Sequence, residues 1–202
     1  MPPIETATAL LLVWAAVGYF AGSIPSGVLL ARAMGLGDLR QIGSGNIGAT
    51  NVLRTGNKKA AALTLLFDAL KGLVPVVLAR FVTGEDAAQV VALAAFIGHC
   101  FPVWLKFKGG KGVATYFGVT FGVYWPLGVA AALIWLGVAA VTRYSSLSAL
   151  LTAGFAPLAL VVLGNGTPFF LMVALGILVY ARHWQNIQRL RKGEESKIGA
   201  KG

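Results

Sequence analysis

The sequence predicts an all-α, polytopic integral membrane protein with about seven transmembrane helices. Of its 202 residues, 57% are hydrophobic and only 12% are charged, whereas about a quarter of the residues in a soluble domain are charged. The apolar residues also fall into blocks of roughly 15–20, the length with which a helix crosses a hydrocarbon core of about 30 Å. A soluble helical bundle would need more charge on its surface, so the composition argues against one.

Residues 1–202 are expected to form a single integral membrane domain. The first segment is interrupted by Gly22–Gly27, where glycine, serine and proline favour a kink or an unwound turn. The fourth and fifth are short and adjoin at residues 124–126, which leaves five crossings with re-entrant segments as an alternative to seven. A polar tail from about residue 184 is expected on the cytoplasmic side. The expected segments are residues 7–31, 60–80, 88–105, 113–125, 127–142, 147–163 and 168–183.

The loops between these segments differ sharply in charge. One set of loops and the tail hold nearly all the basic residues, whereas the other set, at residues 1–5, 83–86, 124–126 and 164–167, holds none. Because positive loops face the cytoplasm, we expect the N-terminus outside and the C-terminus inside. The first residues lack the basic stretch of a cleavable signal, so the first apolar segment is expected to remain as a helix.

The net charge of +10 would suggest a nucleic-acid partner in a soluble protein. In a membrane protein it is explained by topology and by an anionic substrate, so no nucleic acid is expected. The lone Cys100 excludes an internal disulfide. No cofactor and no metal site are expected, because carboxylates are few near the polar motifs.

The first polar motif is Gly-Ser-Gly-Asn-Ile-Gly-Ala-Thr-Asn at residues 43–51, followed by Arg54. Small residues let backbone N–H groups approach an anion, and an arginine binds phosphate with two hydrogen bonds. The motif contains G-x-G-x-x-G, but no strand precedes it, so a dinucleotide site is excluded. A glycine-rich helix connection is the alternative. The candidate phosphate ligands are Ser44, Asn46, Thr50, Asn51 and Arg54.

The second motif is Lys-Gly-Gly-Lys-Gly at residues 108–112, where an apolar segment begins. Helix N-termini and flexible backbone nests bind phosphate. It is not a Walker A loop, because Leu105 stands in place of glycine and Gly112 in place of the magnesium-binding hydroxyl. Positive charge that only sets topology is the alternative. The candidates are Lys108, Gly109, Gly110, Lys111 and Gly112, with His99 as a nearby helix-end residue.

The third motif contains His183 and Asn186, which share one face of a helix because they are three residues apart. Simple helix capping is the alternative. A weaker patch at residues 143–148 adds Ser146. Asp68 and Lys71 lie inside the second apolar segment, and such an intramembrane pair is either structural or lines a site.

All these patches fall on the predicted cytoplasmic side of the membrane. Together they offer lysine, arginine, serine, threonine, asparagine and histidine with few carboxylates. This set suits one or more phosphate groups, and it favours anionic substrates, one of them a lipid that reaches the site from the membrane interface.

Four stretches resemble the acyl-phosphate-dependent glycerol-3-phosphate acyltransferases of bacterial cytoplasmic membranes, the PlsY family. They are GSIPSG at 22–27, GSGNIGATNVLR at 43–54, GHCFPVWLKFKGGKGVAT at 98–115 and HWQNIQRLRKGEESKIG at 183–199. The resemblance implies a seven-helix fold with a cytoplasmic active site. It also implies transfer of a fatty acyl group from acyl phosphate to the 1-hydroxyl of glycerol 3-phosphate, giving lysophosphatidic acid and inorganic phosphate.

The resemblance further implies roles for individual residues. Ser44, Arg54 and Lys111 would be catalytic, and His183 and Asn186, with Ser146, would position glycerol 3-phosphate. An enzyme that makes acyl phosphate would act upstream. The remaining substrate-binding residues would be Asn46, Thr50, Asn51, His99, Lys108, Gly109, Gly110 and Gly112.

Related chemistry in other acyltransferases uses an H-x-x-x-x-D dyad, which is absent because Trp104 and Gln188 lie five residues after the two histidines. We therefore expect catalysis without a protein base. An anion or phosphate transporter is the main rival, but it needs polar residues at both membrane faces. A metal-dependent phosphatidyl transferase would need clustered aspartates, and the predicted cytoplasmic half holds only Asp38 and Asp68.

Overall fold

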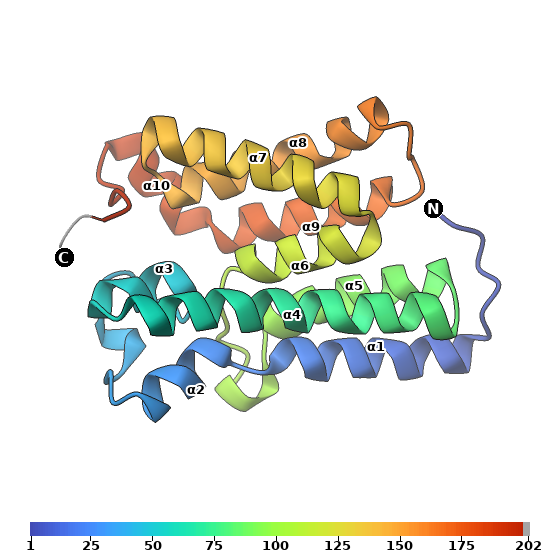
Figure 1. The fold of residues 1–202 in the computed structure, drawn as a ribbon, viewed down its shortest axis with the longest axis horizontal. Helices are drawn as coiled ribbons and strands as arrows, with labels where there is room; N and C mark the ends of the chain where they lie inside the picture. Colours follow the sequence, from blue (N-terminus) through green and yellow to red (C-terminus); the bar gives the residue numbers. More distant parts are fainter. Residues whose placement is uncertain (200–202) are drawn as a thin grey trace.

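The computed structural model describes residues 1–199, and these residues form a bundle of α-helices with short 3-10 turns between them (Figure 1). No strand occurs within the described residues. The helices are α1 (Thr8–Ser23), α2 (Ser26–Ala33), α3 (Ala49–Val52), α4 (Lys58–Val82), α5 (Glu85–Cys100), α6 (Val113–Val123), α7 (Trp125–Thr142), α8 (Ser145–Val162), α9 (Phe169–Arg182) and α10 (Trp184–Lys192).

The long helices run side by side along the long axis of the molecule. In Figure 1, α1, α4 and α5 lie in one half, α7, α8 and α9 in the other, and α6 between them. The principal packing pairs are α1 with α5, α4 with α6, and α7 with α8. The apolar core where these halves meet includes the fully buried side chains of Phe96, Leu127, Met172 and Leu175. The N- and C-terminal regions lie at opposite ends of the bundle.

The chain is a multi-pass membrane protein by the length and hydropathy of its helices. Five spans have at least 18 residues and are apolar enough to cross a membrane: Thr8–Ala33, Lys58–Val82, Glu85–Leu105, Trp125–Thr142 and Ser145–Val162. Two shorter apolar helices, α6 and α9, complete the bundle. Large apolar side chains such as Phe81 (84% exposed) and Val141 (86% exposed) point outward, as expected for side chains that face lipid. Every predicted apolar segment therefore contains a helix, while a count of seven full crossings stays a prediction.

The predicted interruption of the first segment is confirmed as a break between α1 and α2. Helix α1 ends at Ser23 and α2 begins at Ser26, with Ile24 and Pro25 between them. The Ile24 carbonyl accepts hydrogen bonds from the Ser26 N–H (3.0 Å) and from the Lys71 ammonium (2.7 Å). The break is tolerated because these bonds satisfy a carbonyl that a continuous helix would have paired.

Glycines allow the closest helix contacts. A Cβ atom at Gly22 of α1 would overlap the carbonyl of Ala95 on α5, and one at Gly98 of α5 would overlap the carbonyl of Tyr19 on α1. Between α4 and α6, Gly118 faces the Ala69 carbonyl in the same way. Small residues therefore bring the backbones together, which is the usual way for helices to associate in lipid.

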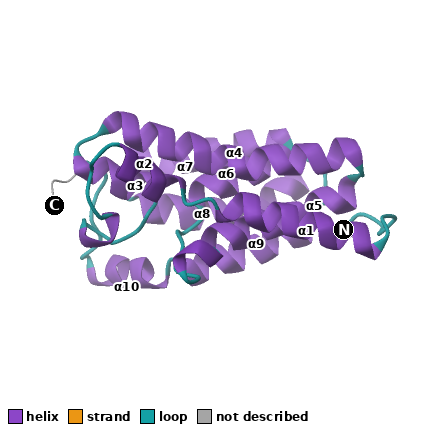
Figure 2. Cartoon of the chain, turned by 90° about the horizontal axis from the view of Figure 1, so that it is seen from below, coloured by secondary structure: helices purple, strands orange, loops and turns teal. Residues whose placement is uncertain are grey.

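The described residues end in a short helix and a folded segment. Helix α10 follows α9 after His183 alone and ends at Lys192, and the next residue, Gly193, takes a left-handed conformation. Figure 2 shows α10, α2 and α3 at the same end of the bundle. Residues 184–199 thus return to the polar motifs rather than extending away from them.

Candidate active site

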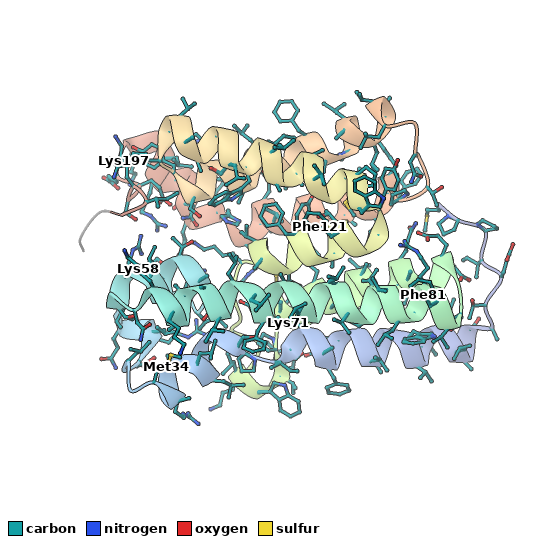
Figure 3. The ribbon with its side chains drawn as sticks, viewed as in Figure 1. Met34, Lys58, Lys71, Phe81, Phe121 and Lys197 are labelled. Atoms are coloured by element: carbon teal, nitrogen blue, oxygen red, sulfur yellow. The ribbon has the colours of Figure 1, made fainter. Side chains whose placement is uncertain are left out.

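The polar motifs meet at the end of the bundle that carries α2, α3 and α10 (Figure 2). Figure 3 shows Lys58 and Lys197 at this end and Phe81 at the other, with Lys71 about midway. The motifs come from four separate stretches of the chain, so only the folded bundle brings them together.

The first motif folds around the side chain of Asn51, which is buried. Its Oδ1 atom accepts hydrogen bonds from the Ser44 N–H (3.1 Å) and from Nη1 of Arg54 (3.3 Å), and its Nδ2 donates to the Leu39 carbonyl (2.9 Å). Gly43 has φ +50° and packs against the same side chains of Arg54 and Asn51. Asn51 therefore shapes the loop and orients Arg54.

The other residues of the first motif differ in their exposure and in their hydrogen bonds. Ser44 and Thr50 are exposed, and the Thr50 hydroxyl lies 3.4 Å from that of Ser145. The Oδ1 atom of Asn46 accepts from the Ile47 N–H (3.0 Å) within its own turn. Both hydroxyl-bearing residues thus lie at the surface, although the Ser44 hydroxyl also donates to Oδ1 of Asn51 (3.3 Å), while Asn46 uses its oxygen within its own turn.

The second motif forms a tight loop against the end of α5. The N–H groups of Gly109 and Gly110 donate to the carbonyls of Cys100 and His99, both at 3.1 Å. Arg182 donates to the carbonyls of Gly110 and Gly109, also at 3.1 Å. The expected backbone nest thus has two of its N–H groups already occupied, which leaves Lys111 as its most direct ligand for an anion.

The two residues at the ends of this loop differ in conformation and contacts. Gly112 takes φ +80° at the start of α6, a left-handed conformation that favours glycine. Lys108 is exposed, and its carbonyl accepts a hydrogen bond from Arg40 of the first motif's segment. Arg40 therefore joins the first and second motifs.

The third motif meets the second through one contact. Lys111 Nζ donates to Oδ1 of Asn186 (2.5 Å), and Nδ2 of Asn186 donates to Oε1 of Glu195 (2.6 Å). Ser146 also donates to Oε1 of Glu195 (2.7 Å). His183 is buried beside them, with Nδ1 at 2.8 Å from the carbonyl of Val179. The structure thus brings Lys111, Ser146, His183 and Asn186 to one place.

The tail after α10 folds over this cluster. Arg189 pairs with Oε2 of Glu195 (2.7 Å), and Nη2 of Arg54 donates to the Ser196 hydroxyl (2.5 Å). The Ile198 N–H donates to the Arg143 carbonyl (2.7 Å). Glu195 and Ser196 therefore connect the third motif with the first.

Sequence reasoning assigned no role in the site to Arg40, Arg182, Glu195 and Ser196. Glu195 and Ser196 lie inside the last of the four stretches, 183–199, which was the available signal. Arg40 and Arg182 act through backbone carbonyls, a role that no residue spacing reveals.

The electrostatics of the cluster are dominated by cations. Burial lowers the pKa of Lys111 to about 8; Glu195 opposes this shift, and Arg189, Arg54 and Arg182 add to it. Burial alone would raise the pKa of Glu195, but hydrogen bonds from Ser146, Asn186 and Arg189 outweigh it and hold that pKa below its ordinary value. An anion placed beside Lys111 would raise its pKa again and stabilise the ammonium form, so the site favours anionic ligands.

His99 lies behind the glycine loop. It is 4% exposed, and its Nδ1 is 3.1 Å from the Thr115 hydroxyl and 3.7 Å from Oδ1 of Asp68. The predicted Asp68–Lys71 pair is present, with 2.7 Å between Nζ and Oδ1. Asp68 comes from another helix, so a search for H-x-x-x-x-D could not find a carboxylate near this histidine.

The arrangement suits phosphate chemistry. Lysine, arginine, serine and asparagine side chains converge, and within residues 1–199 no group of three His, Cys, Asp or Glu side chains is placed to hold a metal ion. Cationic and hydroxyl donors around an anion stabilise the charge that develops during acyl transfer.

Comparisons with known proteins agree with this chemistry. A family model described as glycerol-3-phosphate acyltransferase matches residues 12–193. The chain is 59% identical over 201 residues to the glycerol-3-phosphate acyltransferase of Ruegeria pomeroyi, covering 100% of this chain and 99% of the relative. It is 56% identical to that of a Jannaschia species, covering 98% of each.

Two solved structures have the same fold. Both are crystal structures of PlsY (YgiH), an integral membrane glycerol 3-phosphate acyltransferase. The glycerol 3-phosphate form has a TM-score of 0.89 and 39% sequence identity. The lysophosphatidic acid form has a TM-score of 0.85 and 37% identity, and each match covers 94% of this chain and 96% of the other.

Proposed function

The chain belongs to the glycerol-3-phosphate acyltransferase family, and we propose that its acyl donor is acyl phosphate. The chain is a membrane acyltransferase of glycerol 3-phosphate, with lysophosphatidic acid as its product. The reaction supplies the first acylated intermediate of phospholipid synthesis. With acyl phosphate as donor, the second product is inorganic phosphate.

One observation carries this proposal: the contact between Lys111 and Asn186 inside a group of arginines. Two substrates that each bear a phosphate need cations on both sides of the reacting atoms. Arg54 from the first motif and Lys111 from the second supply them from separate elements, and Ser196 and Glu195 bridge the two sides.

The residue roles follow from these positions. Arg54 and Ser44 bind one phosphate beside the first motif, with Thr50 at its rim. Lys111 binds the other phosphate, while Ser146, His183 and Asn186 orient the glycerol 3-phosphate hydroxyl. Asn51 keeps Arg54 in place, and the Lys108–Gly112 loop carries Lys111. Asn46 contributes through the shape of its turn.

The reaction needs no protein base in this scheme. The 1-hydroxyl oxygen of glycerol 3-phosphate attacks the carbonyl carbon of the acyl phosphate and forms the new ester bond. The carbon–oxygen bond to phosphate breaks, inorganic phosphate leaves, and a substrate phosphate oxygen takes the hydroxyl proton. Lys111 and Arg54 stabilise the developing negative charge, and positioning of the two substrates supplies much of the rate.

The location of the enzyme follows from its charge pattern. Basic residues collect at the end of the bundle that carries the active site, as in proteins whose positive loops face the cytoplasm. The enzyme would therefore lie in a bacterial cytoplasmic membrane with its active site and C-terminus inside. An upstream enzyme that makes acyl phosphate would deliver the donor there.

The test is release of inorganic phosphate by purified protein given acyl phosphate, with and without glycerol 3-phosphate. We expect release that requires the acceptor, continues in EDTA, and falls by about 10²-fold or more in Arg54→Ala and Lys111→Ala. His183→Ala should lose activity without rescue at high pH. A loss of order 10⁴ in kcat that higher pH rescues would instead identify a histidine base.

A transporter of phosphate is the rival class, and the family relationship does not favour it. Folded protein that releases no phosphate but moves phosphate across proteoliposomes would overturn the proposed function. Activity that disappears in EDTA would overturn the metal-free mechanism alone.

A further inference from the structure

Four buried polar side chains form a network behind the glycine loop. Asp68 and Lys71 lie on α4, His99 lies at the end of α5, and Thr115 lies in the first turn of α6. Their exposed fractions are 2%, 9%, 4% and 0%. Polar groups at such depth in a membrane protein are costly unless paired, so their presence calls for a role.

The hydrogen bonds define the orientation of His99. The Thr115 hydroxyl donates to the backbone carbonyl of Asp68 (2.9 Å), because a carbonyl can only accept. Its oxygen then accepts from Nδ1 of His99 (3.1 Å). The Nδ1 atom therefore carries a proton, and in the neutral ring Nε2 is left with its lone pair.

The Nε2 side of the ring is packed against the glycine loop. A Cβ atom at Gly110 would overlap Nε2 of His99, so only glycine fits there. The His99 carbonyl also accepts from the Gly110 N–H (3.1 Å). Both the ring and the backbone of His99 thus fix Gly110, the residue before Lys111. An imidazole covered in this way is placed to support the loop rather than to reach a substrate.

Lys71 extends the network to the first motif. Its ammonium contacts Oδ1 of Asp68 and the Ile24 carbonyl, both at 2.7 Å, and so anchors the break before α2. In the first turn of α2, Gly27 packs so closely on the Ile47 carbonyl that a Cβ atom would overlap it. Lys71 thus fixes the helix on which the first motif rests.

We infer that Asp68, Lys71, His99 and Thr115 are positioning residues that hold both phosphate-binding motifs in their working geometry. The inference rests on the proposed function of the site. Thr115 is the best place to test it, because replacing its hydroxyl removes the hydrogen-bonded bridge from His99 to the Asp68 carbonyl of α4 without leaving a buried charge unpaired.

The experiment measures kcat and KM for both substrates in the full-length protein, comparing wild type with Thr115→Val. We expect KM for at least one phosphate-bearing substrate to rise about tenfold, the effect of one lost hydrogen bond, while kcat changes less than about threefold. Thr115→Ser should restore the wild-type KM, because the hydroxyl returns. The substrate affected identifies the phosphate that the glycine loop binds.

The matched control is Thr120→Val, the same change one turn or more along α6. Thr120 is also buried, but its hydroxyl donates to the Phe117 carbonyl of its own helix (2.9 Å), outside the network. We expect wild-type kinetics for this variant. Thr115→Ala serves as a second network variant, because its smaller side chain cannot overpack α6.

Several results would overturn the inference. Equal kinetics for Thr115→Val and Thr120→Val would do so, as would a loss in Thr115→Val that is confined to kcat. Failure of Thr115→Ser to restore the wild-type KM would also contradict it. The same holds if both Thr115→Val and Thr115→Ala misfold while Thr120→Val folds. A wild-type enzyme without acceptor-dependent activity would instead overturn the proposed function. The two failures are therefore distinguishable.

Discussion

Lys111 lies among three arginines and one carboxylate, and this setting makes its charge sensitive to pH. Its pKa is lowered from the ordinary 10.5 to about 8 by burial first and by Arg189, Arg54 and Arg182 next. The ammonium form, which binds phosphate, is therefore present below pH 8 and is lost as the pH rises through it.

We expect kcat/KM of the wild-type enzyme to fall above about pH 8, approaching tenfold per pH unit, because this ratio follows the titration of the free enzyme. In Lys111→Arg the fall should disappear up to about pH 10, since a guanidinium stays charged to above pH 12. The measurement is the pH profile of both proteins, corrected for spontaneous donor hydrolysis. A wild-type profile that stays flat to pH 9.5 would contradict the assignment, as would the same decline in Lys111→Arg.

Asn51 is a residue that shapes the site although its buried side chain is used by other parts of the protein and not by a ligand. Its amide links Ser44, Arg54 and the Leu39 carbonyl and is buried. Its residue type and its place beside Arg54 were visible in the sequence. Its role as the centre of the turn was not, because the Leu39 carbonyl that holds it lies twelve residues earlier.

At the scale of helices, glycine decides how closely α1 and α5 approach. Gly22 contacts the Ala95 backbone with no room for a Cβ atom, whereas Gly137 on α7 has no other atom within 4 Å of where its Cβ would lie. The same substitution should therefore have opposite effects at these two positions.

Gly22→Ala should lower the free energy of unfolding by about 1–3 kcal/mol, because the backbones of α1 and α5 must separate. Gly137→Ala should be neutral or stabilising by up to about 1 kcal/mol, since alanine is the better helix former. Thermal unfolding in one detergent measures both. Equal stability of the two variants would show that α1 and α5 are not held by this contact.

The break between α1 and α2 is an element that sequence and structure explain together. Proline and glycine predicted an interruption at residues 22–27, and the structure places it at Ile24 and Pro25. The partner of the freed Ile24 carbonyl, Lys71, comes from α4 and depends on tertiary packing.

At the scale of the whole molecule, charged residues are unevenly distributed along the long axis of the helix bundle. Lys58 and Lys197 lie at the end that carries the site, while Phe81 lies at the opposite end (Figure 3). From the positive-inside rule we predict that the end with the site faces the cytoplasm.

Single cysteines can test this orientation in whole cells. Gly166→Cys, in the exposed α8–α9 connection with open space around it, should react with a membrane-impermeant maleimide from outside. Lys58→Cys, exposed at the start of α4, should react only after permeabilisation. The native Cys100 is buried and gives little background. Reversed labelling would place the active site on the outer face.

The sequence by itself determined the membrane class, the apolar segments, the break in the first of them and the chemistry of the polar motifs. These features are local: hydropathy over about 20 residues sets a span, and residue type sets what a motif can bind. Loops with and without basic residues also alternate along the chain, so the expected orientation needed no coordinates.

Only the tertiary structure decided which groups of the motifs face one another. Lys111 meets Asn186, Glu195 joins Ser146 to Arg189, and Asp68 lies beside His99. The contacts of Lys111 with Asn186, of Glu195 with Ser146 and of Asp68 with His99 each join parts of the chain that are at least 31 residues apart. Sequence spacing carries no information about such distances, because packing between helices, not position along the chain, determines them.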